Sequence, residues 1–301
     1  MSDLAVETQD LYKTFPGGVV AVDGLDLAVP RGTVYGLIGR NGAGKTTTLR
    51  LLAGVLYPEG GFAHVLGESL WQAPPEKKAR LGYVSQLQRL HQWMTLEELC
   101  HYVSHFYEKW DAPHARWLAD HFELNWDRPV GWMSGGQQQK AGLVLALAAR
   151  PEVLILDEPA AGLDPIARRD LIWQLVDVIA RGDGSSIILS THIISDLERI
   201  AEHVGIMAEG KLVQSGRLDE LQSRTKRVQV IFEGSAPPAG FAVPGAVRSQ
   251  VDGPVITAIA TLDADTDLDQ VRRLPGVRVN VFPLGLEDLY IELFGGSEDG
   301  Q

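Results

Sequence analysis

The sequence contains very little cysteine and no long apolar segment. Cys100 is the one cysteine among 301 residues, so no disulfide can form within the chain, which is typical of proteins from a reducing compartment. No apolar run approaches the roughly 20 residues that a helix needs to cross a bilayer. The N-terminal stretch MSDLAVETQD is acidic, unlike a secretory signal. We therefore expect a soluble protein that meets a membrane only through a partner.

Positive charge is also scarce. Lysine and arginine number 27 against 39 aspartates and glutamates, which gives a formal net charge of −12. Binding to nucleic acid depends on clustered lysine and arginine, so we do not expect nucleic acid as a partner. The hydrophobic content of 45% is ordinary for a globular protein, and the length indicates one large domain with a smaller one.

The order of the predicted elements indicates an α/β fold. Residues 153–159 (VLILDEP) and 185–192 (SSIILSTH) are continuous apolar runs, a pattern typical of buried parallel strands. Strands alternate with helices, as in a three-layer core, and a helical block at about residues 90–150 is inserted between two of the strands. An Asp-Gly pair at positions 23–24 predicts a turn, and the segment around Glu209 and Gly210 predicts a hairpin.

A domain boundary is expected near residue 224. Residues 1–224 contain all the motifs described below. In residues 225–301, the segments RVQVIFEG, PVITAIATLD and VRVNVFPL predict strands, and TDLDQVRRL predicts a helix. Proline and glycine are frequent between these segments. We expect this part of the chain to form a small α+β domain.

The stretch GRNGAGKT at residues 39–46 matches the phosphate-loop pattern G-x-x-x-x-G-K-S/T between a predicted strand and a predicted helix. Glycines let the backbone curl so that successive N–H groups face the β- and γ-phosphates. Lys45 supplies a positive charge, and the Thr46 hydroxyl supplies a ligand for Mg²⁺. The nucleotide-binding residues expected here are Gly39, Asn41, Gly42, Ala43, Gly44, Lys45, Thr46 and Thr47.

Two carboxylates follow the apolar run at 153–156. Asp157 is placed to hold Mg²⁺ through water, and Glu158 is placed to polarise the water that attacks a phosphate. A second anion site is predicted far along the chain at residues 131–140 (GWMSGGQQQK), where a helix begins with two glycines at its tip. One chain thus carries two phosphate-binding tips but a single nucleotide pocket.

With these motifs the chain resembles the ATP-binding cassette (ABC) family over about residues 4–221. MSGGQ at residues 133–137 is similar to the family signature, and AGLDP at residues 161–165 is similar to the D-loop. Gln86 resembles the Q-loop glutamine and His192 the switch histidine, and all of these motifs occur in the order of the family.

The resemblance assigns roles to individual residues. It implies catalytic roles for Glu158, His192 and Gln86, and Mg²⁺ contacts for Thr46, Gln86 and Asp157. An aromatic side chain is expected to stack on adenine, and Phe15 fits best with Tyr12 as the alternative. The further nucleotide contacts implied are Ser134, Gly135, Gly136, Gln137 and Asp164.

The resemblance also implies an architecture and partners. The expected fold is a P-loop ABC ATPase core with an antiparallel β subdomain and an inserted helical subdomain. The expected cofactors are ATP and Mg²⁺. Two such chains, identical or related, pair head to tail so that the SGGQ tip of one closes on the ATP of the other, which explains the two tips. The pair powers integral membrane permease subunits from the cytoplasmic face, and Trp93 is the candidate for an exposed permease contact.

A role in export is the first hypothesis, because GLEDLYIELFGG at residues 285–296 resembles the ending of bacterial export-type ATPases. The alternative is a soluble ABC ATPase that acts on ribosomes or DNA. Ribosome-acting members usually carry two cassettes, and DNA-repair members insert a long coiled coil before the signature. This chain has one cassette and a short segment between Lys45 and Ser134. A third interpretation, a P-loop kinase, is rejected because it does not account for the SGGQ motif and His192.

Overall fold

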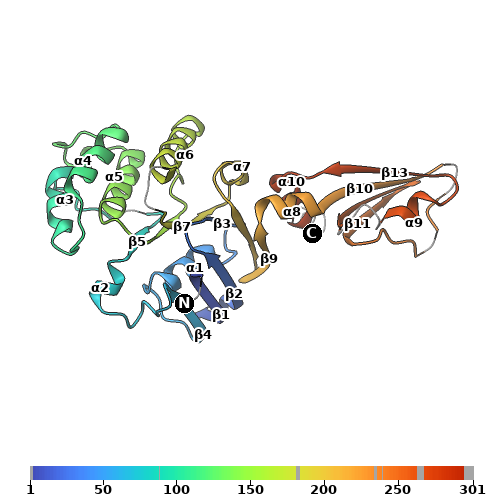
Figure 1. Ribbon diagram of the computed structural model, residues 1–301, viewed down its shortest axis with the longest axis horizontal. Coiled ribbons are helices and arrows are strands. Elements are labelled where there is room, and N and C mark those ends of the chain that lie inside the picture. The colour runs from blue at the N-terminus through green and yellow to red at the C-terminus, as the bar shows by residue number, and fades with distance from the viewer. Residues whose placement is uncertain are drawn as a thin grey trace. The chain divides into compact units, whose positions relative to one another are not determined.

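The computed structural model describes residues 3–87, 89–180, 184–233, 236–238, 240–262 and 268–294. The chain divides into two compact units, Met1–Ser215 and Gly216–Gln301, and each is described by itself (Figure 1). The boundary expected near residue 224 falls at the end of the first helix of the second unit. None of the helices in the described ranges is long and apolar enough to cross a membrane.

A six-stranded sheet forms the centre of the first unit. Its strands are β3 (Val34–Gly39), β5 (Leu81–Val84), β6 (Val153–Asp157), β7 (Ser186–Thr191), β8 (His203–Ala208) and β9 (Lys211–Arg217). Their order is β5-β6-β7-β3-β8-β9, and the first four neighbouring pairs are parallel. Every residue of β3 and β6 is buried, which explains why these strands are apolar without alternation. The predicted hairpin is confirmed, with its turn at Glu209 and Gly210.

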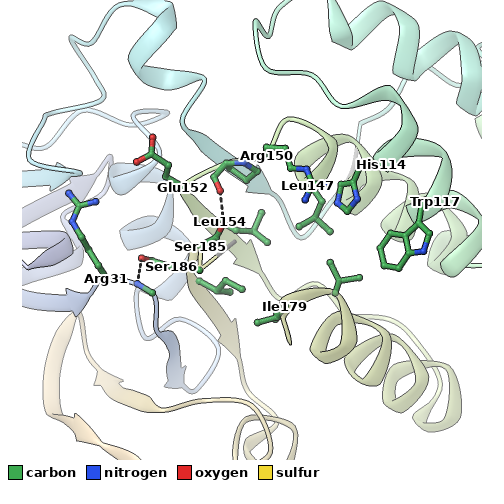
Figure 2. Close-up of a pocket in the computed structure, with 15 residues that line it drawn as sticks. Arg31, His114, Trp117, Leu147, Arg150, Glu152, Leu154, Ile179, Ser185 and Ser186 are labelled. Atoms are coloured by element: carbon green, nitrogen blue, oxygen red, sulfur yellow. Dashed lines mark hydrogen bonds between the residues drawn. The ribbon is translucent and has the colours of Figure 1, made fainter. Parts of the chain in front are cut away.

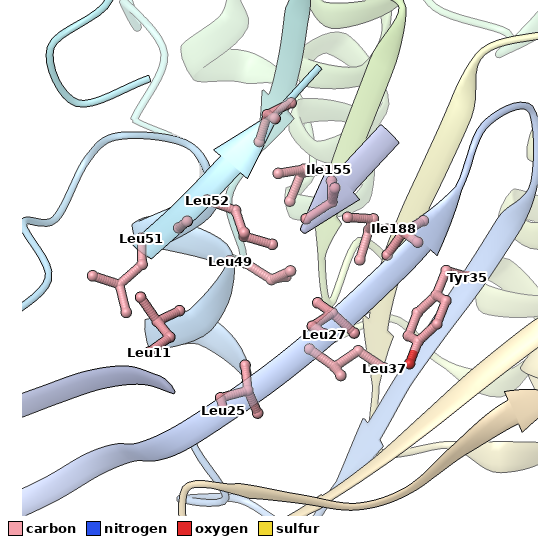
Figure 3. Close-up of a cluster of buried hydrophobic side chains, with 14 of the residues drawn as sticks. Leu11, Leu25, Leu27, Tyr35, Leu37, Leu49, Leu51, Leu52, Ile155 and Ile188 are labelled. Atoms are coloured by element: carbon pink, nitrogen blue, oxygen red, sulfur yellow. The ribbon is translucent and has the colours of Figure 1, made fainter. Parts of the chain in front are cut away.

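A three-stranded antiparallel sheet with the order β2-β1-β4 packs beside the first sheet. Its strands are β1 (Leu4–Phe15), β2 (Val19–Pro30) and β4 (Gly60–Val65). Helix α1 (Lys45–Leu52) shares one buried cluster with both sheets, because Leu49 and Leu52 lie with Leu27 of β2 and with Leu37 of β3 (Figure 3). This core ties the start of α1 to the ends of the central strands.

The predicted turn at Asp23-Gly24 is wrong, because β2 runs through this pair. The chain forms an irregularity instead: Gly24 has φ 63°, and the register with β1 shifts on both sides of the pair Leu11–Leu25. Where the regular pairing of β1 with β2 is interrupted, the buried Thr8 side chain supplies hydrogen bonds to β2. Its hydroxyl donates to the Leu25 carbonyl at 2.7 Å and accepts from the Leu27 amide at 2.9 Å. A side chain of the neighbouring strand thus keeps β2 continuous.

Further helices of the first unit lie between its strands along the chain. They are α2 (Pro75–Lys78), α3 (Leu96–Ser104), α4 (Ala112–His121), the short 3₁₀ helix η1 (Val130–Trp132), α5 (Gly135–Ala148), α6 (Pro165–Ala180) and α7 (Ile194–Leu197). The elements α3 to α5 lie between β5 and β6, which are neighbours in the sheet. The predicted insertion of a helical subdomain into an α/β core, beside an antiparallel β subdomain, is therefore confirmed (Figure 1).

In the described residues, the second unit is a four-stranded antiparallel sheet with three helices. Its elements are α8 (Leu218–Arg224), β10 (Thr225–Phe232), β11 (Ala246–Asp252), β12 (Val255–Thr261), α9 (Asp269–Arg272), β13 (Val277–Pro283) and α10 (Leu286–Phe294). The strand order is β11-β12-β10-β13, and Val228, Val230 and Ile256 lie in its core. The sequence did not predict β11. The predicted helix at 266–274 is observed as α9, and its first two residues lie outside the described ranges.

The Thr8→Val substitution tests the support of the irregular strand. Valine keeps the shape of threonine but leaves the buried Leu25 carbonyl and Leu27 amide without a partner, so the free energy of unfolding should fall by about 1–3 kcal/mol. All seven tryptophans lie in the first unit, so tryptophan fluorescence during urea unfolding measures that unit. Thr8→Ser keeps the hydroxyl and is the control; equal stability of the two variants would contradict the assigned role.

Candidate functional site

The phosphate loop, the carboxylate of Asp157 and His192 gather at one edge of the central sheet. β6, β7 and β3 are neighbouring parallel strands, so their carboxyl ends lie side by side. The phosphate loop follows β3, Asp157 ends β6, and His192 follows β7. The edge where parallel strands end is the usual place for a ligand in an open α/β sheet. The topology therefore brings together three motifs that are far apart in the sequence.

The phosphate loop has a backbone that requires glycine. Gly44 has φ 101°, and a Cβ on it would lie 2.2 Å from the Ala21 carbonyl oxygen of β2. Helix α1 begins directly after it without a side-chain cap, so its first N–H groups are available to an anion. Lys45 is buried, and its Nζ donates to the Gly39 carbonyl at 2.7 Å. In the rest of the loop, Asn41 and Gly42 are exposed, Ala43 is buried, and Thr46 and Thr47 are half-buried.

Asp157 is fully buried and lies against the start of α1. Its Oδ1 accepts hydrogen bonds from Thr46 Oγ1 and Ser190 Oγ, both at 2.9 Å. Its Oδ2 is buried and has no hydrogen-bond partner within the described ranges. Burial, and after it the charge of Asp157, raises the pKa of Tyr83 nearby. An orphaned carboxylate oxygen beside a hydroxyl is a set of hard oxygen donors, so these residues fit a Mg²⁺ ion.

Glu158 makes contacts with both of its carboxylate oxygens. Oε1 lies 3.4 Å from Lys45 Nζ, and Oε2 lies 2.9 Å from His192 Nδ1. The residue is buried and has φ 45°, a conformation that non-glycine residues seldom adopt. Its N–H donates to Ser190 Oγ at 3.0 Å. The side chain is thus held between a cation and an imidazole, with its backbone tied to β7.

Ser190 is the site residue that the sequence analysis missed. It is fully buried at the end of β7, and its hydroxyl donates to Asp157 and accepts from the Glu158 amide. The one available signal was a serine directly after the apolar residues 187–189, two residues before His192. A single hydroxyl therefore links the Asp157 carboxylate to the backbone of Glu158.

The second predicted anion site is built as a helix tip. Ser134 caps α5: its hydroxyl accepts from the Gln137 amide at 3.2 Å, while the Gln137 side chain accepts from the Ser134 amide at 3.0 Å. Gly135 is exposed, and a Cβ on it would meet nothing within 4 Å. No hydrogen bond or ion pair between described residues joins this tip to Lys45 or Thr46. The structure of one chain does not bring the two anion sites together.

Gln86 and the two candidate aromatic residues lie nearer the surface. Gln86 is exposed after β5, and within the described ranges it makes no hydrogen bond to Asp157. Phe15 is 38% exposed at the end of the β1–β2 hairpin, where it pairs with Val19. Tyr12 is half-buried, with its Cβ against Gly60 of β4. Phe15 is thus the more accessible of the two rings.

Asp164 has a structural role within its own chain. Its Oδ1 accepts from the Ile166 and Ala167 amides, both at 3.0 Å, and so caps the start of α6. These bonds, first of all the one from Ala167, hold the pKa of the Asp164 carboxyl below its usual range. The cap keeps Asp164 negative and fixes the loop that precedes α6.

Several aromatic side chains of the helical subdomain face solvent. Trp93 and Trp132 are each 73% exposed, and Trp110, Trp117 and Trp126 are half-buried. The His91 and Trp93 rings lie 4.8 Å apart. A groove of about 440 Å³ along α3 is lined by Met94, Glu98, His101, Tyr102, His105 and Phe106. We call Trp93, Tyr102 and Phe106, which are all exposed, the aromatic surface.

A separate cavity lies at the opposite ends of the same strands. Figure 2 shows this cavity of about 320 Å³, where Ser185 and Ser186 at the start of β7 meet Trp117 of α4 and Ile179 of α6. The Ser185 hydroxyl donates to the Pro151 carbonyl at 2.7 Å. None of the predicted site residues lines the cavity. It is therefore distinct from the phosphate loop and the two carboxylates.

Comparisons with known proteins agree with the geometry. The family model described as ABC transporter matches residues 22–161. The bacitracin transport ATP-binding protein BcrA of Bacillus licheniformis is 34% identical over 224 residues, 74% of this chain and 72% of that protein. The Nod factor export ATP-binding protein I of Burkholderia orbicola is 31% identical over 305 residues, 98% of each chain. A solved structure of an ATP-binding subunit of an ABC transporter has a TM-score of 0.65 at 29% identity, and the match covers 73% of this chain and 92% of that one.

The Ser190→Ala substitution tests the link between the Asp157 carboxylate and the Glu158 backbone. Asp157 loses a donor and the Glu158 amide loses an acceptor, so kcat for ATP hydrolysis should fall about tenfold. Nucleotide affinity should change little, because the hydrogen bonds of the Ser190 hydroxyl go to Asp157 and Glu158 and not to the phosphate loop. Steady-state kinetics and a nucleotide titration measure the two quantities. A parallel loss of affinity and kcat would indicate general damage to the fold instead.

Proposed function

This chain belongs to the ATP-binding proteins of ABC transporters, which are ATPases, and we propose that it powers export through a separate membrane permease as one half of a head-to-tail dimer. The relative from Burkholderia orbicola is named for Nod factor export, which supports the direction. The permease would choose the substrate, and it would hold this chain on the cytoplasmic face of the membrane.

The main support for the dimer is that the phosphate loop and the Ser134 tip are separate within one chain. Lys45 and Thr46 lie at the sheet edge, whereas the Ser134–Gly135 tip is open and makes no hydrogen bond to them. A symmetric head-to-tail pair would bring the tip of each chain to the phosphate loop of the other. The N–H groups of the tip would then stabilise charge on the γ-phosphate. This arrangement uses both sites with one nucleotide in each pocket.

The cluster at the sheet edge supports a division of roles in hydrolysis. The Lys45 ammonium group would turn from Glu158 to the phosphates when ATP binds. Glu158 would then be available to polarise the attacking water. His192, at 2.9 Å from Glu158 Oε2, would hold that carboxylate in place. Thr46 and Asp157, with Gln86 after closure, would hold Mg²⁺, which neutralises charge on the phosphates when bound. Phe15 would stack on adenine, and Asp164 would contact the nucleotide from the D-loop of the opposite chain.

We assign this chemistry to residues 1–224, because every residue named for it precedes the second sheet. Residues 225–301 then form a domain of their own that is not needed to bind ATP. The aromatic surface of the helical subdomain is the face assigned to the permease, since three large exposed rings, of which Tyr102 and Phe106 line the groove along α3, would bury apolar area against a partner.

Mixing two inactive variants tests the head-to-tail dimer. Lys45→Ala damages the phosphate loop and Ser134→Arg damages the tip, so both sites fail in either homodimer. A mixed dimer combines the native Lys45 of one chain with the native Ser134 of the other, and one site is restored. With random exchange, about half of the dimers should be mixed. Radiolabelled ATP trapped per dimer measures the restored site.

Two features make the mixing experiment decisive. Glu158→Gln is added to both variants so that bound ATP is not consumed, and different fluorescent labels confirm the exchange of subunits. The controls are the two unmixed variants. If exchange is complete and the mixture traps no more ATP than the controls, the Ser134 tip serves its own chain and the dimer proposal is wrong.

Trp93→Ala tests the surface assigned to the permease. Removal of a ring that is 73% exposed should leave ATP hydrolysis unchanged, while binding to membrane vesicles that contain the permease should weaken about tenfold. Co-sedimentation with vesicles stripped of the endogenous chain measures the binding. Trp71→Ala is the matched control, because Trp71 is 42% exposed but lies outside the helical subdomain. Equal losses for both variants would contradict the assignment.

A further inference from the structure

The second unit has one strand that is exposed along its whole length. β11 is the first strand in the order β11-β12-β10-β13, and all seven of its residues are exposed. Every other strand of the described ranges contains at least one residue that is not exposed. No described strand pairs with the outer side of β11. Backbone N–H and C=O groups on such an edge are a template for another strand.

The regularly paired part of β11 is short and carries opposite charges at its two ends. A bulge interrupts its pairing with β12 at Val247, since Ala246 pairs with Ala260 while Arg248 pairs with the next residue, Ile259. From Arg248 to Asp252 the register is unbroken. This segment, RSQVD, has a cation at one end, a carboxylate at the other and Gln250 in the middle.

We propose that β11 pairs antiparallel with β11 of a second copy of this chain, centred on Gln250, so that two four-stranded sheets join into one. In this register Arg248 of each copy lies opposite Asp252 of the other. Directly opposed residues of an antiparallel pair share one face of the sheet, and opposite charges in such positions attract. The twofold symmetry of the pairing uses the same surface on both copies, as isologous dimers do.

The charges and the regular pairing of residues 248–252 favour a register centred on Gln250 over one centred on Ser249. Centring the pair on Ser249 would place Val247 opposite Val251, but Val247 is the bulged residue and is not part of a regular ladder. That register would also place Arg248 opposite Gln250, which forms no ion pair. The interface goes beyond the proposed function, because it lies outside the nucleotide site and needs no ATP.

Charge reversal tests the interface in the full chain, without nucleotide and with EDTA, so that a nucleotide-dependent dimer does not contribute. The wild type should dimerise. Arg248→Asp and Asp252→Arg should each weaken the dimer about tenfold, because both attractive pairs become repulsive. The double variant, and an equal mixture of the two single variants, should recover dimers, since opposite charges face one another again. Sedimentation velocity measures the dimer fraction.

The alternative outcomes are distinct. A monomeric wild type would overturn the proposal, and Arg248 and Asp252 would then serve to keep the edge unpaired. A wild-type dimer that is insensitive to both reversals would place its interface elsewhere and would also overturn it. The mixing experiment on ATP trapping is unaffected by either result, so failure here is distinguishable from failure of the head-to-tail dimer.

A disulfide tests the register itself. Gln250→Cys places two thiols opposite one another at a Cα separation of about 4.5–5.5 Å, which a disulfide can span. Ser249→Cys is the control, because its two copies are offset along the strands and lie beyond about 7 Å. Burial raises the pKa of the native Cys100 thiol to about 12, so this thiol should not compete. Crosslinking of Ser249→Cys in preference to Gln250→Cys would overturn the register.

Discussion

The pairing of β6 with β7 is the constraint on which the site depends. Asp157 and Ser190 are partners in this parallel register, so the serine hydroxyl lies directly beside the carboxylate and also reaches the Glu158 amide. A shift of one residue would turn Ser190 to the other face of the sheet. Because β3 pairs with β7 on the other side, the same register positions the phosphate loop, and a buried α1 keeps Thr46 against Asp157.

The antiparallel sheet contributes to the same site from outside. The carbonyl of Ala21 closes on Gly44 so tightly that only glycine fits, and the hairpin that carries Phe15 begins at this end of β2. Thr8 keeps β2 continuous through its irregular part. A sheet without a predicted catalytic residue thus closes on the phosphate loop and carries the proposed adenine contact.

The two proposed interfaces differ in physical character. The contact between the Ser134 tip and a phosphate loop is electrostatic and needs the charge of a nucleotide, so it would form and dissolve with ATP binding and hydrolysis. Pairing of β11 uses backbone hydrogen bonds and two ion pairs, and it is independent of nucleotide. A contact of this second kind would keep two chains together between cycles and raise the effective concentration of each for the other.

The sequence by itself determined the phosphate loop, the carboxylates Asp157 and Glu158, the histidine after β7 and the alternation of strands with helices, because each depends on a short local pattern. The roles of these residues in binding and hydrolysing nucleotide stay predictions, as do those of Gln86, Phe15 and Asp164. Only the tertiary structure decided that Ser190 links Asp157 to the Glu158 backbone, that Gly24 lies in a bulge, that Trp132 faces solvent and that β11 is an open edge. These features depend on strand register and on neighbours far apart in the chain, which a local pattern does not encode.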